Sequence, residues 1–255
     1  EAYPRKTAFA DEHTSLTYRE LSDLSMRIGS VLGQKTGPRR PVPVLTEKNV
    51  FTLGAFMGIV RAGCFYICLD ANQPAERLNR ILDSLQANGG RATFFMVGSR
   101  VDSNADVIRR MAAQGCEVAN HTYDHKYITK IGADGIRSQV GSTNQKIQAV
   151  CGVAPTLLRP PGGYKDAASL AVLGSMGMPA VMWSIDTRDW QHKNSQKTIE
   201  TVLSQVKDGD IILMHDIYDP TADAAVILIP ELTARGYQLV TVSELAAYRG
   251  GMQPG

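Results

Sequence analysis

The sequence predicts an α/β fold in which parallel βα units carry polar residues at the ends of their strands. Six short apolar segments, each separated from the next by enough chain for a helix or a long loop, follow residue 90: ATFFMV, EVANH, TLLR, AVMWSID, DIILMH and YQLVTV. Several of them end on chemically capable side chains, namely Asn120-His121, Arg159, Asp186 and His215. Because the carboxyl ends of parallel strands lie at one face, we expect these side chains to gather there.

The first part of the chain predicts a helix followed by a second set of alternating elements. Thr17 and Glu20 have capping-box spacing, and helical periodicity follows, so a helix should start near Tyr18. Further along, the pattern predicts a strand over 42–45, a helix over 50–62, a buried strand over Phe65–Asp70 and a helix over 74–88.

Composition limits the possible functions. With 255 residues and 44% hydrophobic content, the chain can form one large domain or two smaller ones. A net charge of +2, without a basic run interleaved with aromatic residues, argues against a nucleic-acid partner. We expect no membrane span, because no apolar stretch is long enough. The chain opens without an apolar signal core, which leaves its localisation open.

The stretch NHTYDH places His121 and His125 four residues apart after a predicted strand. On one helical turn, two imidazoles at this spacing can reach one divalent ion. By itself, this spacing is weak evidence, because it more often belongs to ordinary surface or core histidines.

The stretch LLRPPGGY places Arg159 before a turn of Pro160, Pro161, Gly162 and Gly163. Rigid prolines followed by permissive glycines can direct backbone N–H groups into a cleft, where they can hold an oxyanion. A plain tight turn is the alternative.

Two later stretches supply acid and base groups. SIDTRDW contains Asp186, Asp189 and Trp190, and IILMH places His215 just after a strong apolar strand. A histidine suits general acid or base catalysis because its pKa lies near neutrality. Each of these residues alone is more often structural than catalytic.

Taken together and in this order, ATFF, HTYDH, RPPGG, DTRDW and LMH closely resemble the later motifs of the NodB-like polysaccharide deacetylases, the metal-dependent carbohydrate esterases of family four. The resemblance covers residues 81–249. It implies a distorted (β/α)7 barrel and hydrolysis of N-acetyl groups on an amino-sugar polysaccharide or oligosaccharide of the peptidoglycan or chitin type. It also implies a divalent metal, with zinc expected first and cobalt or nickel as alternatives, and a secreted or cell-envelope location.

The resemblance assigns the hydrolytic roles residue by residue. His121 and His125 become metal ligands, and His215 becomes the general acid, tuned by Asp189. Arg159 would orient the catalytic aspartate.

It also assigns the substrate-binding residues. The backbone N–H of Gly162 would hold the oxyanion within the Pro161-Gly162-Gly163 turn. Trp190 and Leu213 would form the walls of the acetyl pocket.

The N-terminal part resembles a different family. The segment RAGCFYICLDANQPAERLNRIL, residues 61–82, is similar to a core segment of adenylate-forming domains, such as those of nonribosomal peptide synthetases and D-alanine ligases. Nothing after Leu82 continues that resemblance, and the Gly/Ser/Thr-rich phosphate loop is absent, so we expect no ATP cofactor. The expected domains are an adenylate-forming-like fragment over 1–80 and a deacetylase-like domain over 81–250.

The deacetylase resemblance lacks its first motif, of TFDDGP type, which would supply the catalytic base and a third metal ligand. Phe65–Asp70 and the helix that follows form a βα unit that could serve as the first barrel strand, paired beside ATFFMV. Asp70 would then stand at the base position, whereas Ala71 has no oxygen for a metal. The alternative is that the residues before about 80 are a mismatched appendage.

Two functions therefore remain open. The first is a metal-dependent deacetylase whose altered first motif lowers its activity. The second is a catalytically inactive chimera that keeps the fold and the carbohydrate cleft.

Overall fold

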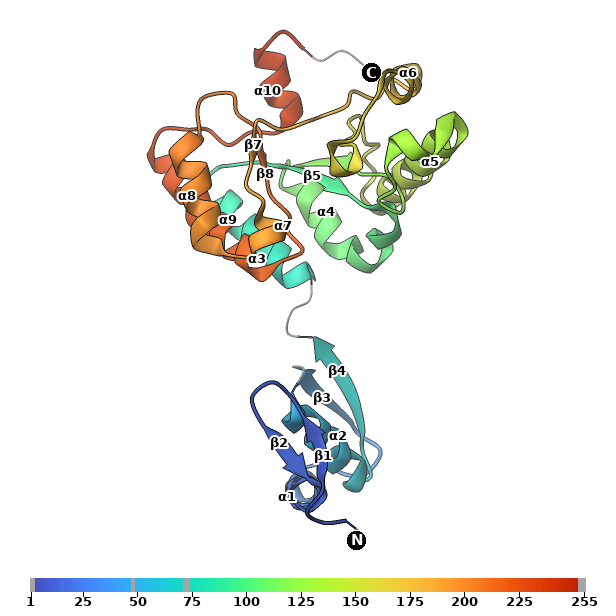
Figure 1. Cartoon of the computed structure of the whole chain (residues 1–255), viewed down its shortest axis with the longest axis vertical. Helices are drawn as coiled ribbons and strands as arrows, with labels where there is room; N and C mark the ends of the chain where they lie inside the picture. Colours follow the sequence, from blue (N-terminus) through green and yellow to red (C-terminus); the bar gives the residue numbers. More distant parts are fainter. Residues whose placement is uncertain (1–2, 47–48, 71–73, 252–255) are drawn as a thin grey trace. The chain divides into compact units, whose positions relative to one another are not determined.

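The computed structural model describes residues 3–46, 49–70 and 74–251, and the chain divides into two compact units, residues 1–73 and 74–255 (Figure 1). Helix α3 (Pro74–Ala87) belongs wholly to the second unit, so the units divide a few residues before the position 80/81 expected from the sequence. The reason is visible in its contacts. Arg80 on α3 forms an ion pair with Asp223 on α9 (Asp219–Ala234).

The first unit closely follows the elements expected from the sequence and adds an antiparallel hairpin before them. Its elements are β1 (Thr7–Ala10), β2 (Ser15–Thr17), α1 (Tyr18–Lys35), β3 (Pro41–Thr46), α2 (Val50–Arg61) and β4 (Phe65–Asp70). The predicted start of α1 is confirmed, because the Thr17 side chain accepts the Glu20 N–H and the Glu20 carboxylate accepts the Thr17 N–H.

The pairing of β4 corrects one expectation. β4 pairs in parallel with β3 over six residue pairs, from Pro41 opposite Phe65 to Thr46 opposite Asp70, and α2 connects the two strands. The predicted pairing of Phe65–Asp70 with ATFFMV is therefore wrong, since β5 (Thr93–Met96) pairs with β6 (Glu117–Asn120). A βαβ connection of one helix supplies β4 with a partner from its own unit.

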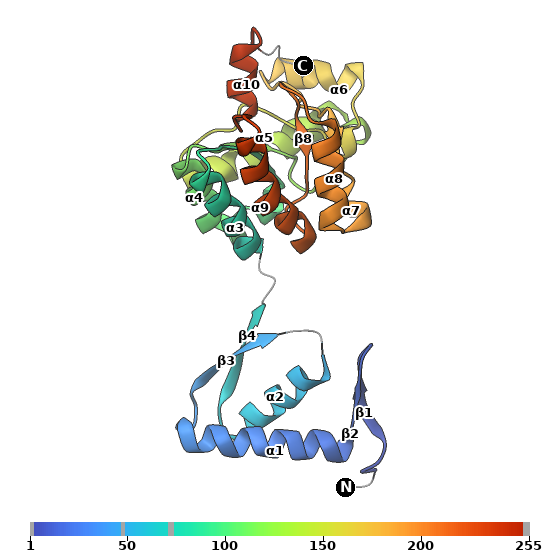
Figure 2. The ribbon, with the colours of Figure 1, turned by 90° about the vertical axis from the view of Figure 1, so that its left-hand side faces the viewer.

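The second unit is an α/β arrangement in which helices lie outside short parallel strands (Figures 1 and 2). Besides α3, β5, β6 and α9, it contains α4 (Ala105–Ala113), α5 (Gly132–Cys151), α6 (Ala167–Ser175), β7 (Ile185–Asp186), α7 (Asp189–His192), α8 (Ser195–Gln205), β8 (Ile212–Leu213), α10 (Val242–Tyr248) and short 3-10 turns. Its largest apolar cluster joins residues of α3, α4, α9 and β6, including Leu82, Ile108 and Val118.

Four of the six predicted strands are much shorter than expected or absent, and DIILMH forms only the two-residue strand β8. TLLR pairs only through Leu158, which bridges Asn120 and Ala180, and AVMWSID forms only the two-residue strand β7 beyond that bridge. Prolines flank these stretches at 155, 160 and 179, and a proline has no N–H to donate to a sheet.

The last segment, YQLVTV, forms no strand in the described part of the chain. Leu239 still accepts a hydrogen bond from the Arg91 N–H. Two residues later, however, Thr241 caps α10 by accepting the Glu244 N–H, and the backbone leaves the sheet direction. No described helix combines the length and apolarity that a membrane crossing requires.

Close approach of α1 and α2 in the first unit depends on glycine. A Cβ atom added to Gly58 would lie 2.6 Å from two carbon atoms of Ile28 and 3.0 Å from the Ser25 carbonyl oxygen. We expect Gly58→Ala to destabilise this unit by about 1–3 kcal/mol, because the helices must separate. Urea unfolding followed by far-UV circular dichroism measures this.

Gly33, on α1, is the matched control, because a Cβ there meets nothing within 4 Å. Gly33→Ala should stabilise the unit by about 0.4–1 kcal/mol. Tryptophan fluorescence, which reports on Trp183 and Trp190 of the second unit, should not change in either variant. Unaltered stability of Gly58→Ala would contradict the packing argument.

Candidate active site

The loop after β6 is fixed by Asn120, a fully buried amide. Its side-chain N–H groups donate to the Val140 carbonyl oxygen and to Asn144 Oδ1, and its Oδ1 accepts the Thr122 N–H. The His121 N–H donates to the Met96 carbonyl oxygen, continuing the β5–β6 ladder by one residue. His121 is thereby held at the carboxyl end of a strand.

His121 and His125 lie together in this loop. Their rings meet edge to face with centroids 4.8 Å apart, and His121 Nδ1 lies 2.7 Å from the Arg159 carbonyl oxygen. That oxygen can only accept, so Nδ1 carries the proton and Nε2 keeps its lone pair. Burial lowers the pKa of His121 from 6.5 to about 4, and burial with the nearby His215 also lowers the pKa of His125. Both imidazoles are therefore neutral at pH 7, the form that binds a metal.

The backbone of this loop differs from the helical turn that the spacing predicts. Thr122 and His125 have φ angles of 62° and 57°, a left-handed conformation that is strained in residues other than glycine. Gln139 on α5 holds the strained segment, because its Oε1 accepts the N–H groups of both Tyr123 and Asp124. The two rings meet through this loop and not through a helix.

Arg159 is buried beside the histidines. Its guanidinium lies over the Phe95 ring at 4.1 Å and donates through Nη2 to the Met182 carbonyl oxygen, whereas Nε has no partner among the described residues. Burial lowers the pKa of Arg159 to about 10, which still leaves it charged at pH 7. A buried cation with an unpaired donor favours a carboxylate neighbour.

The Pro-Pro-Gly-Gly stretch forms a 3-10 turn, Pro161–Gly163. Gly162 and Gly163 have φ angles of 63° and 73°, and a Cβ on Gly163 would lie 2.8 Å from the Trp183 ring. Both positions therefore need glycine. The Gly163 N–H donates to the Pro160 carbonyl oxygen, which fixes the turn.

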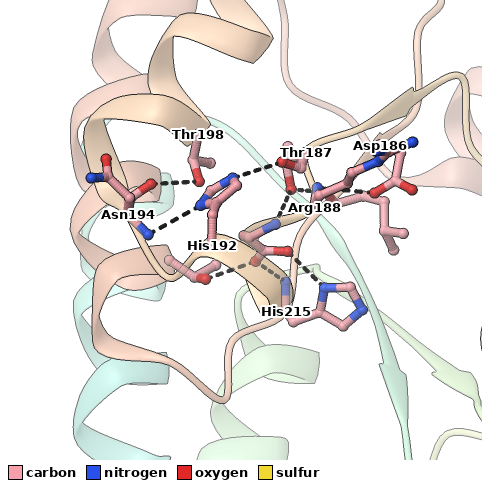
Figure 3. Close-up of polar contacts among 10 residues, drawn as sticks. Asp186, Thr187, Arg188, His192, Asn194, Thr198 and His215 are labelled. Carbon is pink, nitrogen blue, oxygen red and sulfur yellow. Dashed lines mark hydrogen bonds and ion pairs between the residues drawn. The ribbon is translucent and has the colours of Figure 1, made fainter.

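Buried Asp189 pairs with the half-buried His215, which is labelled in Figure 3. Asp189, only 1% exposed, accepts His215 Nδ1–H at 2.8 Å, the His215 N–H at 2.6 Å and the Thr221 hydroxyl at 2.7 Å. Burial alone would raise the pKa of Asp189, but these hydrogen bonds hold it below its ordinary value of 3.8. His215 Nε2 is left available to exchange a proton with a substrate.

The remaining predicted residues of this region lie around that pair. Leu213 is buried, and its carbonyl oxygen accepts the Thr187 hydroxyl. Trp190 is 49% exposed, and Asp186 is exposed and accepts the Arg188 N–H. Figure 3 shows Thr187 also accepting a hydrogen bond from the His192 ring.

Sequence reasoning missed Asp216 and Arg77. Burial raises the pKa of Asp216, which is adjacent to His215, although His215 and Arg77 oppose that rise. The nearly buried Arg77, on α3, donates through Nε to the Asp216 carbonyl oxygen and forms an ion pair with Asp219. Arg77 thus ties the loop after His215 to α3. The only sequence signal was a charged residue beside the strand-terminal histidine.

The two imidazoles of His121 and His125 are of the ligand type that a divalent metal binds, because both are neutral, lie side by side and are oriented by their neighbours. Among the described residues, no group of three or more histidine, cysteine, aspartate or glutamate side chains could hold a metal. Ala71 and the side chain of Asp70 lie outside the described part, so the role expected for Asp70 stays a prediction.

The α/β arrangement of the second unit is the fold of solved polysaccharide deacetylases. The family model "Polysaccharide deacetylase" matches residues 58–181. The chain is 41% identical over 177 residues to the peptidoglycan-N-acetylmuramic acid deacetylase PdaC of Bacillus subtilis, covering 69% of this chain and 37% of that protein. It is 34% identical over 175 residues to a peptidoglycan-N-acetylglucosamine deacetylase of Bacillus cereus, covering 67% and 82%. The chain belongs to the polysaccharide deacetylase family.

Solved structures agree with this assignment. The structure of PdaC from Bacillus subtilis matches with a TM-score of 0.65 at 39% identity, covering 69% of this chain and 85% of that one. A CE4 family pseudoenzyme from Bacillus anthracis matches with a TM-score of 0.63 at 26% identity, covering 81% of this chain and 64% of that one. A mutant of that pseudoenzyme with restored enzymatic activity matches with a TM-score of 0.63 at 30% identity, covering 68% of this chain and 64% of that one. The chain spans only about a third of the length of PdaC and of the Listeria monocytogenes deacetylase PgdA, at 37% and 35%.

Replacing Asp189 should cost stability in a pH-dependent way. Its pKa is lowered in the folded state, so its contribution is complete above its unfolded value of 3.8 and is lost as pH falls through the lower folded pKa. We expect Asp189→Asn to destabilise the second unit by about 1–3 kcal/mol at pH 7, with a deficit that shrinks below pH 3.8. Urea unfolding followed by tryptophan fluorescence at several pH values measures this.

Asp186→Asn is the matched control, because Asp186 is an exposed carboxylate three residues away. It should change stability by no more than about 0.5 kcal/mol. A deficit for Asp189→Asn that stays constant down to acid pH would show that the carboxylate charge is not what stabilises the pair.

Proposed function

We propose that this chain is a metal-dependent hydrolase that removes N-acetyl groups from an amino-sugar polysaccharide of the peptidoglycan or chitin type. The observation that carries the proposal is the position of His215, oriented by buried Asp189 and close enough to His121 and His125 to lower the pKa of both. Two neutral imidazoles and an oriented acid in one loop cluster suit amide hydrolysis. The deacetylase names of the relatives support the same substrate class.

The chain's own residues would divide the work of the reaction. His215 protonates the departing amine through Nε2, while Asp189 holds its ring and stabilises the imidazolium. The Gly162 N–H lies in the turn proposed to hold the carbonyl oxyanion. Trp190 and Leu213 would contact the acetyl group.

His121 and His125 would hold the divalent metal, for which we propose zinc, with cobalt or nickel as alternatives. Such an ion, when bound, polarises a carbonyl and lowers the pKa of a bound water. Arg159 would keep the carboxylate of the general base ionised and oriented.

We infer further that the first catalytic motif is altered and that activity is low. Asp70 would act as the base, and Ala71 would stand where a third ligand is needed. The family match begins at residue 58 and therefore includes the β4–α3 segment, which supports aligning it with the first motif. Arg159 Nε has no partner among the described residues, so it has room for a carboxylate of the first motif.

The second candidate is an inactive chimera that keeps the deacetylase fold, with a first unit derived from an adenylate-forming domain. Large apolar side chains of the first unit are exposed, including Phe51 on α2 and Phe65, Tyr66 and Ile67 on β4. Such exposure suits a piece of a larger fold. A CE4 family pseudoenzyme, that of Bacillus anthracis, is among the solved structures that the chain matches. Metal content and turnover of an N-acetylglucosamine oligomer separate the two candidates.

Metal binding should depend on the histidine pair and be weak. Catalytic zinc sites usually keep three protein ligands, and this chain offers two. We expect a dissociation constant above about 1 μM, and His121→Ala should weaken binding at least about 10-fold. Cobalt titration followed by its d–d absorption measures both and separates imidazole from thiolate ligands.

His13→Ala is the control, because His13 is exposed in the first unit. It should bind cobalt as the unmodified chain does. Tight binding that survives His121→Ala would contradict the assignment of the metal site.

Restoring a carboxylate should restore activity. We expect Ala71→Asp to raise zinc affinity and acetate release from a chitin oligomer together, the latter on the order of 10²-fold, because a third ligand places the metal and its bound water. Adding His215→Ala to Ala71→Asp should remove most of that gain.

Zinc affinity and acetate release are measured on the same preparations. Restored zinc binding without acetate release would favour the inactive chimera, because Asp70 would then not stand at the base position. A gain that survives His215→Ala would contradict the role of that histidine.

A further inference from the structure

Two exposed tyrosine rings stand beside the Pro-Pro-Gly-Gly turn and have no role in the proposed hydrolysis. Tyr127, two residues after His125, and Tyr164, directly after Gly163, pack with ring centroids 4.8 Å apart at 46°. They are 44% and 55% exposed. Two loops far apart in sequence thus join their aromatic rings at the surface.

Both rings contact the turn itself. A Cβ atom on Gly162 would lie 2.9 Å from Tyr164 Cδ2 and 3.3 Å from Tyr127 Cε1. The rings therefore lie directly against the residue whose N–H is proposed to hold the oxyanion. Because Tyr127 follows a proposed metal ligand and Tyr164 follows the turn, the pair borders the reacting centre.

The pair is held in place before any ligand binds. The Tyr164 N–H donates to the Pro161 carbonyl oxygen, and the Tyr127 carbonyl oxygen accepts the Lys130 N–H. Each ring also limits the rotation of the other. Ordered aromatic surfaces bind with a small entropy cost, since few rotamers are lost on binding.

We propose that Tyr127 and Tyr164 form a stacking platform for the pyranose ring adjacent to the acetylated sugar, so that the chain binds an oligomer more tightly than a single unit. This inference rests on the proposed function and adds the subsite that selects a polymer. A pyranose presents a face of C–H groups that packs on an aromatic ring, with hydroxyl groups around its edge.

The surroundings fit a sugar better than a protein. Lys126 and Asp124, whose charged groups lie 3.7 Å apart and whose side chains are 57% and 43% exposed, belong to the same loop as Tyr127 and offer polar groups for hydroxyls. Two half-exposed rings cover far less than the roughly 800 Å² per partner of a stable protein interface. An occupant the size of one sugar ring matches that area.

The test uses the full chain and penta-N-acetylchitopentaose as the probe, with N-acetylglucosamine for comparison. Binding is measured by calorimetry and by NMR shifts in the presence of zinc. Tyr127→Ala and Tyr164→Ala should each weaken pentamer binding roughly 3- to 10-fold, whereas Tyr164→Phe should bind within about 2-fold of the unmodified chain, because it keeps the ring. Tyr248→Ala, at an exposed tyrosine on α10, is the matched control and should change nothing.

A second measurement needs no variant. In the unmodified chain, intermolecular NOEs should join sugar C–H protons to the rings of Tyr127 and Tyr164. Pentamer binding that is unchanged in both alanine variants, or NOEs that avoid both rings, would overturn the platform and leave the proposed function standing. Failure of the unmodified chain to bind either the pentamer or a peptidoglycan disaccharide, together with no acetate release by the chain or by Ala71→Asp, would overturn both.

Discussion

The hydrogen bonds that converge on the Asp189 carboxylate organise one half of this site. Within the described residues, it accepts bonds from two positions of His215 and from Thr221, so it joins α7 to the segment after β8 and to α9. A buried carboxylate is costly unless it is fully paired, and these bonds offset that cost. The ring of His215 consequently has one orientation, with Nδ1 on Asp189 and Nε2 free for chemistry.

Arg159 is the buried charged residue on the side of the site that holds His121 and His125. The hydrogen-bonding groups of its guanidinium are only partly satisfied among the described residues. It is buried over Phe95 with one donor on the Met182 carbonyl oxygen and Nε unpaired among the described residues. Its carbonyl oxygen nevertheless orients His121. The same residue therefore positions a proposed metal ligand through its backbone, while its side chain forms no ion pair with a carboxylate of the described residues.

Local signals predicted the elements of the first unit closely, whereas the site geometry needed tertiary information. The Thr17–Glu20 capping box set the start of α1, because that interaction lies within four residues. The strand expected at TLLR is reduced to bridges at Leu158, because prolines flank it.

The spacing of His121 and His125 predicted their proximity but not the left-handed backbone that brings the rings together, since Asn120 and the distant Gln139 hold that loop. Asp216 was missed because the desolvation that raises its pKa comes from tertiary packing, which leaves no pattern in the sequence.

The Asp189 and His215 pair and the proposed first motif lie in different parts of the chain. We therefore expect that the second unit can fold even when the first motif is altered. The Asp189 and His215 half is built into the packing of α7 and α9, so it persists whenever the second unit folds. In the proposed mechanism, water activation also needs a first motif, which we propose to lie at the end of β4, a strand that pairs with β3 in the first unit. An alteration there removes little of the apolar core, which joins α3, α4, β6 and α9. A chain with this fold can therefore fold without a working site, and a mutant of the Bacillus anthracis pseudoenzyme with restored enzymatic activity has a fold that this chain also matches.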